Sequence, residues 1–194
     1  MARTPRPRSA PAAPRNAASK NGILYPLDLA YTIAGVPAPT VREISPKDIP
    51  FPYRGLLVHE NDMTLTLERH FGGAVGLRTL STVQNGSWYL RRVLLVQEYS
   101  GRPVEMGAIR VKIDVFPARV RSQILRNERP LGRVLRDGGV DFRSQPRVFL
   151  AVEPNPEMMG VFWMREPRTL YGRQTEMFSG GAKVGDIVEI LPLV

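Results

Sequence analysis

A glutamate stands in an otherwise apolar segment near the end of the chain, IVEIL at residues 187–191. β-Branched residues dominate this segment and Pro192 closes it, a pattern that predicts a β-strand. Side chains alternate across a strand, so Glu189 shares its face with Ile187 and Leu191. A carboxylate among apolar side chains is costly unless it has a partner. The partner of Glu189 is therefore either a structural cation or a ligand.

Two adjacent arginines raise the same question with the opposite charge. Arg91 and Arg92 lie in the segment SWYLRRVLLV, residues 87–96, which also predicts a strand and sends the two side chains to opposite faces. An arginine among large apolar residues presents a planar fork that suits a carboxylate. Two interpretations stay open at this point. One is a structural ion pair with Glu189 or another acid, and the other is a pocket whose buried charges bind a small acid.

Composition excludes several classes of site. The chain has 194 residues, of which 43% are hydrophobic, so we expect residues 23–194 to form a single domain with its own core. Cysteine is absent and only two histidines occur, which predicts no metal site and suits a reducing cytoplasm, the location that we predict. No apolar run is long enough to cross a membrane, and no signal peptide is evident at the N-terminus.

The positive charge is concentrated at the N-terminus. The formal net charge is +9, and residues 1–22 carry five basic side chains, four prolines and no acidic residue. This composition predicts a disordered basic tail over residues 1–22. Such a tail can touch nucleic acid by charge alone, but no platform of aromatic and basic residues accompanies it. We therefore predict no nucleic-acid partner.

Hydrophobic periodicity and turn residues predict an α+β fold, an antiparallel β-sheet with helices packed on the outside over one apolar face. Helices are expected over 27–33, from an N-cap at Asn61 or Asp62 to Gly72, over 117–127 and over 133–136. Strands are expected over 74–83, 87–97, 103–113, 148–152, 168–178 and 184–191. The proline-rich residues 37–53 are expected to be an extended connection, and the stretch RPLG at 129–132 a helix terminator.

Several of these segments occur together in an order that resembles the chorismate lyase (chorismate pyruvate-lyase) family. The resemblance covers roughly residues 57–192. It is carried by ENDMT at 60–64, WYLRRVLL at 88–95, RPLGR at 129–133, and a last hairpin with LYGR at 170–173 and EILP at 189–192. None of these segments is specific alone, but their joint order is.

The resemblance implies an enzyme that converts chorismate to 4-hydroxybenzoate and pyruvate by elimination and aromatisation. It implies a carbon–oxygen lyase of ubiquinone biosynthesis that needs no cofactor, and we expect a monomer with chorismate as its small-molecule partner. Carried over residue by residue, the substrate contacts of the family correspond to Met63, Arg91, Leu131 and Glu189 of this chain, and Gly132 is expected to contact the substrate as well. Arg91 and Glu189 would be the catalytic residues.

A second class of function uses the same fold. One group of transcription regulators has an effector-binding domain of this kind, so the alternative is a non-catalytic domain that binds a small aromatic acid. A regulator is expected to carry a winged-helix DNA-binding domain upstream. The residues upstream of the resemblance are few and rich in proline, which favours the enzyme, and we therefore expect a lyase.

Overall fold

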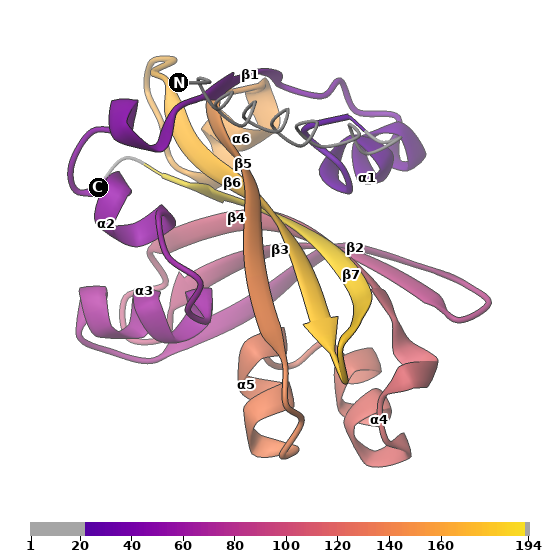
Figure 1. The fold of residues 1–194 in the computed structure, drawn as a ribbon. Helices are drawn as coiled ribbons and strands as arrows, with labels where there is room; N and C mark the ends of the chain where they lie inside the picture. The colour runs from indigo at the N-terminus through magenta and orange to yellow at the C-terminus, as the bar shows by residue number, and fades with distance from the viewer. Residues whose placement is uncertain (1–21, 193–194) are drawn as a thin grey trace, which may run out of the picture.

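The computed structural model describes residues 22–192 as one sheet surrounded by short helices (Figure 1). The predicted basic tail lies, up to residue 21, outside the described residues. The strands are β1 Thr40–Ile44, β2 Val75–Asn85, β3 Trp88–Gln97, β4 Pro103–Lys112, β5 Arg143–Glu153, β6 Leu170–Ser179 and β7 Ala182–Leu191. The helices are α1 Leu27–Ala34, α2 Tyr53–Leu57, α3 Met63–Phe71, α4 Ala118–Arg126, α5 Leu131–Asp137 and α6 Pro156–Val161, with 3-10 turns at Pro46–Asp48 and Ile113–Val115. No helix within residues 22–192 has the length and apolar character to span a membrane.

The seven strands form one antiparallel sheet in the order β1-β5-β6-β7-β4-β3-β2. Two runs of consecutive strands, β2-β3-β4 and β5-β6-β7, are joined where β4 pairs with β7. The turn between β2 and β3 contains Gly86 with a φ of 57°, as the Asn-Gly sequence predicts. The α+β fold class predicted from the sequence is confirmed.

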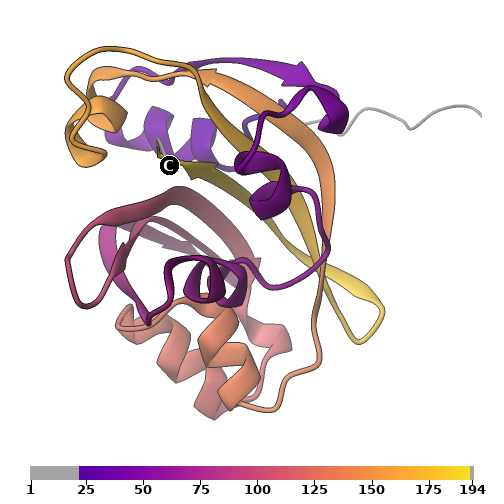
Figure 2. The same ribbon diagram turned by 90° about the vertical axis from the view of Figure 1, so that its left-hand side faces the viewer.

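Helices pack on both faces of the sheet, so the expectation of one covered face is wrong. Leu90 and Leu94 of β3 belong to the core cluster that contains Tyr31 of α1. Tyr89, on the opposite face of the same strand, packs with Ile124 of α4. Figures 1 and 2 show α1 and α6 at one end of the molecule, and α4 and α5 at the other. The central strands are apolar on both sides, and each side needs its own cover.

Two helices have the ends that their sequences predict. Asp62 is the N-cap of α3, and its side chain accepts a hydrogen bond from the backbone N–H of Leu65 at 3.3 Å. Gly72 ends α3 in the left-handed conformation, with a φ of 69°. Pro117 precedes α4, and Asn127 ends it with a φ of 58°. These ends matter because α3 and the residue after α4 both reach the site described below.

Other elements differ from expectation. Strand β1 and the helix α2 begin within the region expected to be a plain extended connection, α6 was not predicted, and β5 begins five residues before the expected start. Helix α5 begins at Leu131, so the segment expected to terminate one helix also starts the next. Pro130 stands at the N-cap of α5, where a missing N–H has no cost.

Candidate functional site

A pocket lies on one face of the central strands and brings together all five residues predicted from the sequence. Arg91 and Glu189 come from β3 and β7, Met63 from the start of α3, and Leu131 and Gly132 from the start of α5. The cavity is about 70 Å³, several times the ~10–15 Å³ that one water needs. Its apolar wall is formed by Val93, Leu95, Ile109, Phe142, Met177 and Ile187.

The strand register fixes how the two predicted charges face the pocket. Arg91 lies opposite Ile109 of β4, and Glu189 lies opposite Gly107 of the same strand. Ile109 and Gly107 are two residues apart, so they share a face at roughly 7 Å along the strand. Arg91 and Glu189 therefore lie on the same face at different levels, and neither is the register neighbour of the other.

Arg91 is a buried cation without a counterion. It is 2% exposed, and none of the ion pairs among residues 22–192 includes it. One terminal nitrogen donates to Asn127 Oδ1 at 3.4 Å and the other to the backbone oxygen of Arg129 at 3.5 Å, while Nε has no partner. Burial lowers the pKa of the Arg91 guanidinium to about 10, so it remains protonated at neutral pH. A buried positive charge with unused donors favours an anion in the pocket.

Glu189 has a structural partner, which is neither Arg91 nor Arg92. Its Oε2 accepts a hydrogen bond from Nε of Arg173, the register neighbour on β6, at 2.5 Å. Arg173 is completely buried and also donates to the backbone oxygens of Leu57 at 3.0 Å and His59 at 2.8 Å. The ion pair thereby ties β6 and β7 to the segment between α2 and α3.

Arg92 points to the opposite face, away from the pocket. Its Nη1 forms an ion pair with Glu157 of α6 at 2.6 Å, and its guanidinium lies over the ring of Tyr31 at 5.0 Å. The interpretation as a structural ion pair therefore describes Arg92, whereas Arg91 has no carboxylate partner among the described residues. The two adjacent arginines differ in their partners although both are buried.

The sequence interpretation missed another acidic residue in the pocket, Glu105 of β4. Its side chain is 5% exposed and its Oε2 has no hydrogen-bond partner. Burial, and then the charge of Glu189, raise the pKa of Glu105 well above its usual value, although Arg173 acts in the other direction. The signal was present: Glu105 interrupts an apolar strand segment just as Glu189 does.

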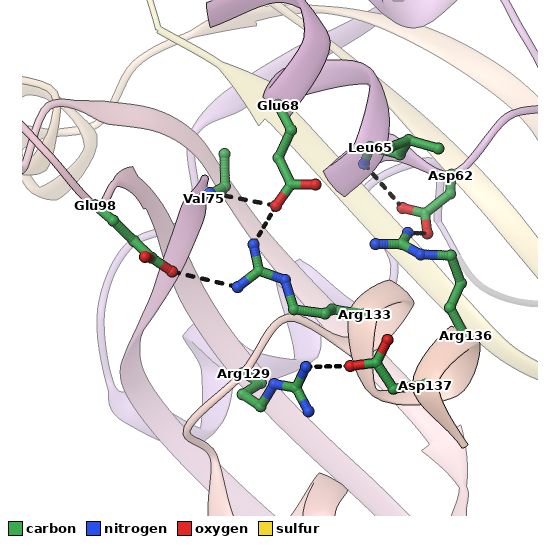
Figure 3. A network of polar contacts seen from close by, with 9 residues as sticks. All are labelled: Asp62, Leu65, Glu68, Val75, Glu98, Arg129, Arg133, Arg136 and Asp137. Carbon is green, nitrogen blue, oxygen red and sulfur yellow. Dashed lines mark hydrogen bonds and ion pairs between the residues drawn. The ribbon is translucent and has the colours of Figure 1, made fainter. Parts of the chain in front are cut away.

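Ion pairs from α5 hold the two helices that form one wall of the pocket (Figure 3). Arg133 binds Glu68 of α3 and also Glu98 at 3.2 Å, in the turn after β3. Arg136 binds Asp62, the N-cap of α3. The network fixes the start of α3 beside the start of α5, where the pocket-lining residues of both helices lie.

We expect Gly132→Ala to lower the free energy of unfolding by about 1 kcal/mol, because the cap of α3 depends on this glycine. A methyl group at Gly132 would collide with the carboxylate of Asp62, which would have to leave Leu65 and Arg136. Urea unfolding measures the change. Gly160→Ala in α6, where no heavy atom lies within 4 Å of the added methyl, is the control and should be neutral or slightly stabilising. Equal stability of the two variants would contradict the prediction.

The described part of the chain has no group of three or more His, Asp or Glu side chains that could hold a metal ion. Its polar pocket residues are two glutamates, an arginine, Asp62, Thr64 and Ser144. This set provides hydrogen bonds and charge for an organic ligand.

The similarity of this chain to known proteins lies in its fold. No family model matches the sequence, and no curated protein matches it. Solved structures do match. PhnF from Mycobacterium smegmatis has 13% identity and a TM-score of 0.49, over 70% of this chain and 65% of that one. The match thus spans less than two thirds of PhnF.

Two further matches are separate domains. The ligand-binding domain of a GntR-family transcriptional regulator from Bordetella bronchiseptica has 14% identity and a TM-score of 0.45, over 60% of this chain and 84% of that one. The C-terminal domain of the histidine utilization repressor from Pseudomonas syringae has 16% identity and a TM-score of 0.38, over 61% of this chain and 91% of that one. At these identities the similarity concerns the fold.

These matches correct the predicted activity. The expectation that the chain is an enzyme, a chorismate pyruvate-lyase, is wrong, because two of the matching structures are a domain of a transcriptional regulator, described as ligand-binding, and a domain of a repressor. The family expectation holds only for the fold, which the lyases and the regulator domains share. Chorismate as the ligand and a place in ubiquinone biosynthesis have no support in these matches. The monomeric state and the cytoplasmic location stay predictions.

Proposed function

We propose that the chain is a non-catalytic domain that binds a small aromatic carboxylic acid in the pocket between α3, α5 and the sheet. The observation that carries this proposal is Arg91, a buried guanidinium that faces the pocket and has no carboxylate partner among residues 22–192. A ligand carboxylate would supply the missing counterion and accept hydrogen bonds from the planar guanidinium of Arg91.

The remaining walls favour a flat apolar body for the ligand. Aliphatic side chains of β3, β4 and β7 line the pocket together with Phe142 and Met177. An aromatic ring buries a large apolar area without losing many internal rotations, which suits such a surface. Met63 and Leu131 cover the ring from α3 and α5. Met63, Leu131, Gly132, Arg91 and Glu189 are thus proposed as ligand-binding residues.

Glu189 would contact the ligand, and its ion pair with Arg173 would hold it in position. The ion pair with Arg173 fixes one of the two carboxylate oxygens of Glu189. Its Oε1 accepts none of the hydrogen bonds formed among the described residues. That oxygen remains for a donor on the ligand.

The test is to measure binding of benzoate and of benzyl alcohol, which differ in the carboxylate, by isothermal titration calorimetry. We expect benzoate to bind at least about 10-fold more tightly, since a hydrogen bond between charged groups contributes about 1.5–3 kcal/mol. Equal affinities would contradict the proposal. Chorismate incubated with the protein should be recovered intact, and release of pyruvate would also contradict it.

A further inference from the structure

A second pocket lies outside the one that contains Arg91. It is lined by residues of the segment 162–168 after α6, by residues 102–103 at the start of β4, and by Pro192. Its cavity is about 280 Å³, close to the ~300 Å³ at which small-molecule sites begin. No residue lines both pockets. We call it the Trp163 pocket, because the side chain of Trp163 is its most unusual feature.

The backbone of Trp163 has a conformation that is unfavourable for tryptophan. The residue follows the C-cap of α6 with a φ of 57°. Its N–H donates to the carbonyl of Gly160 at 3.2 Å. The next N–H, that of Met164, donates to the carbonyl of Met159 at 2.8 Å. This pair of bonds ends many helices, and the left-handed residue in it is usually glycine. Asn127 is the other non-glycine residue with a positive φ among residues 22–192, and asparagine tolerates this conformation better than an aromatic residue does.

Packing does not explain why tryptophan stands at this position. The Trp163 side chain is 63% exposed, whereas the preceding Phe162 belongs to the core. An exposed indole gives up most of the apolar burial that makes tryptophan stabilising. Residues held in sparsely populated backbone conformations cluster at ligand-binding sites. The strain and the exposure of Trp163 therefore both favour a role in binding, with a flat ring face open to a ligand.

The charges in the Trp163 pocket favour a ligand with two negative charges. The lining contains three arginines and one glutamate, a net charge of +2. Glu166 pairs with Arg168, but both side chains are more than 60% exposed, so this pair is weak. Arg165 takes part in none of the hydrogen bonds and ion pairs among the described residues. A phosphate monoester carries about −1.5 to −2 near neutral pH and matches the planar guanidinium group of arginine.

We propose that the Trp163 pocket binds a planar aromatic phosphate monoester, the chemistry of a nucleoside monophosphate. The base stacks on the exposed face of the Trp163 indole, and the phosphate accepts hydrogen bonds from Arg165 and its neighbouring arginines. Single-stranded nucleic acid needs successive stacking side chains along a basic groove. Trp163 is the exposed aromatic side chain of this lining, and Phe162 is buried, so the described residues provide a place for one base. This site is independent of the aromatic acid proposed to bind at Arg91.

The test compares adenosine monophosphate (AMP), adenosine and inorganic phosphate in calorimetric titrations of the full chain. We expect AMP to bind at least about 10-fold more tightly than either fragment, because only AMP combines stacking with charged hydrogen bonds. AMP that binds no better than adenosine would overturn the inference. A single-stranded oligonucleotide that binds more than about 10-fold more tightly than AMP would also overturn it, since the site would then be a nucleic-acid surface.

Three substitutions test the two parts of the site. Trp163→Gly should weaken AMP binding by at least about 10-fold, whereas Trp163→Phe keeps a ring and should stay within about 5-fold of the wild type. Arg165→Met should weaken it by about 10-fold. Arg126→Met is the matched control, an exposed arginine on α4 that does not line the pocket, and should leave AMP affinity within about 2-fold. Equal effects of Arg165→Met and Arg126→Met would overturn the inference.

Stability separates binding from a structural role of Trp163. Trp163→Gly should melt at or above the melting temperature of the wild type, because glycine adopts the left-handed conformation freely. Its affinity for benzoate should stay within about 3-fold, since Trp163 does not line the pocket with Arg91. A melting temperature several degrees lower would show that Trp163 is kept for packing, and would overturn the inference. A change from dimer to monomer on Trp163→Gly would overturn it as well, because the pocket would then be a contact between two chains.

Discussion

Arg173→Met is expected to lower the free energy of unfolding by about 3–5 kcal/mol, the typical cost of removing one partner from a buried ion pair. Arg173 is completely buried, and Glu189 is 6% exposed. The substitution leaves the Glu189 carboxylate without a counterion beside Glu105. It also leaves the backbone oxygens of Leu57 and His59 without their donor. Urea unfolding followed by circular dichroism measures the change.

Two further variants show whether the lost ion pair is the cause. Arg173→Met combined with Glu189→Leu removes both charges and should recover part of the loss, because no uncompensated charge remains. Arg168→Met is the control for removing an arginine from an ion pair. Its partner is Glu166, both side chains are more than 60% exposed, and the expected change is within about 0.5 kcal/mol. A loss below about 1 kcal/mol for Arg173→Met would show that Glu189 does not depend on this pair.

The strand pattern of the central sheet followed from the sequence because its signals are local. Alternation, the Asn-Gly turn and β-branched residues placed β2, β3, β4, β6 and β7 within a few residues. The short elements α2 and α6 were missed, and they have five and six residues. So few residues cannot show a helical period, and tertiary contacts such as those of Leu57 and Met158 in the core stabilise them.

The sequence predicted residues that line the pocket, but it did not predict which side chains form ion pairs with each other. A charged residue in an apolar strand indicates a buried charge, which singled out Glu189 and the adjacent pair Arg91 and Arg92. The resemblance to the chorismate lyase family then selected Arg91. The partner of each charge depends on which strands are neighbours, and β6 beside β7 places Arg173 opposite Glu189. That order arises from contacts far apart in the sequence, which periodicity does not contain. Glu105 carried the same local signal as Glu189.

Arg91→Met is expected to weaken benzoate binding by about 100-fold or more, whereas Arg92→Met should leave it within about 3-fold. Removing one partner of a buried charge pair costs about 2–5 kcal/mol of binding, and only Arg91 faces the pocket. The two variants form a matched pair, since the residues are adjacent on β3, both are buried, and the substitution is the same. Calorimetric titration with benzoate measures both affinities.

Arg91→Met should lose more affinity for benzoate, whereas Arg92→Met should lose more stability. This opposite order separates an effect on ligand binding from damage to the fold. Arg91 has no counterion among the described residues, so Met at this position removes a desolvated charge and loses only two long hydrogen bonds. Its free energy of unfolding should stay within about 1 kcal/mol of the wild type. Arg92→Met leaves Glu157 without its partner and should be the less stable variant by about 1–3 kcal/mol. If Arg91→Met were the less stable of the two and still bound benzoate, Arg91 would be a structural residue and the pocket would need another anchor for an acid.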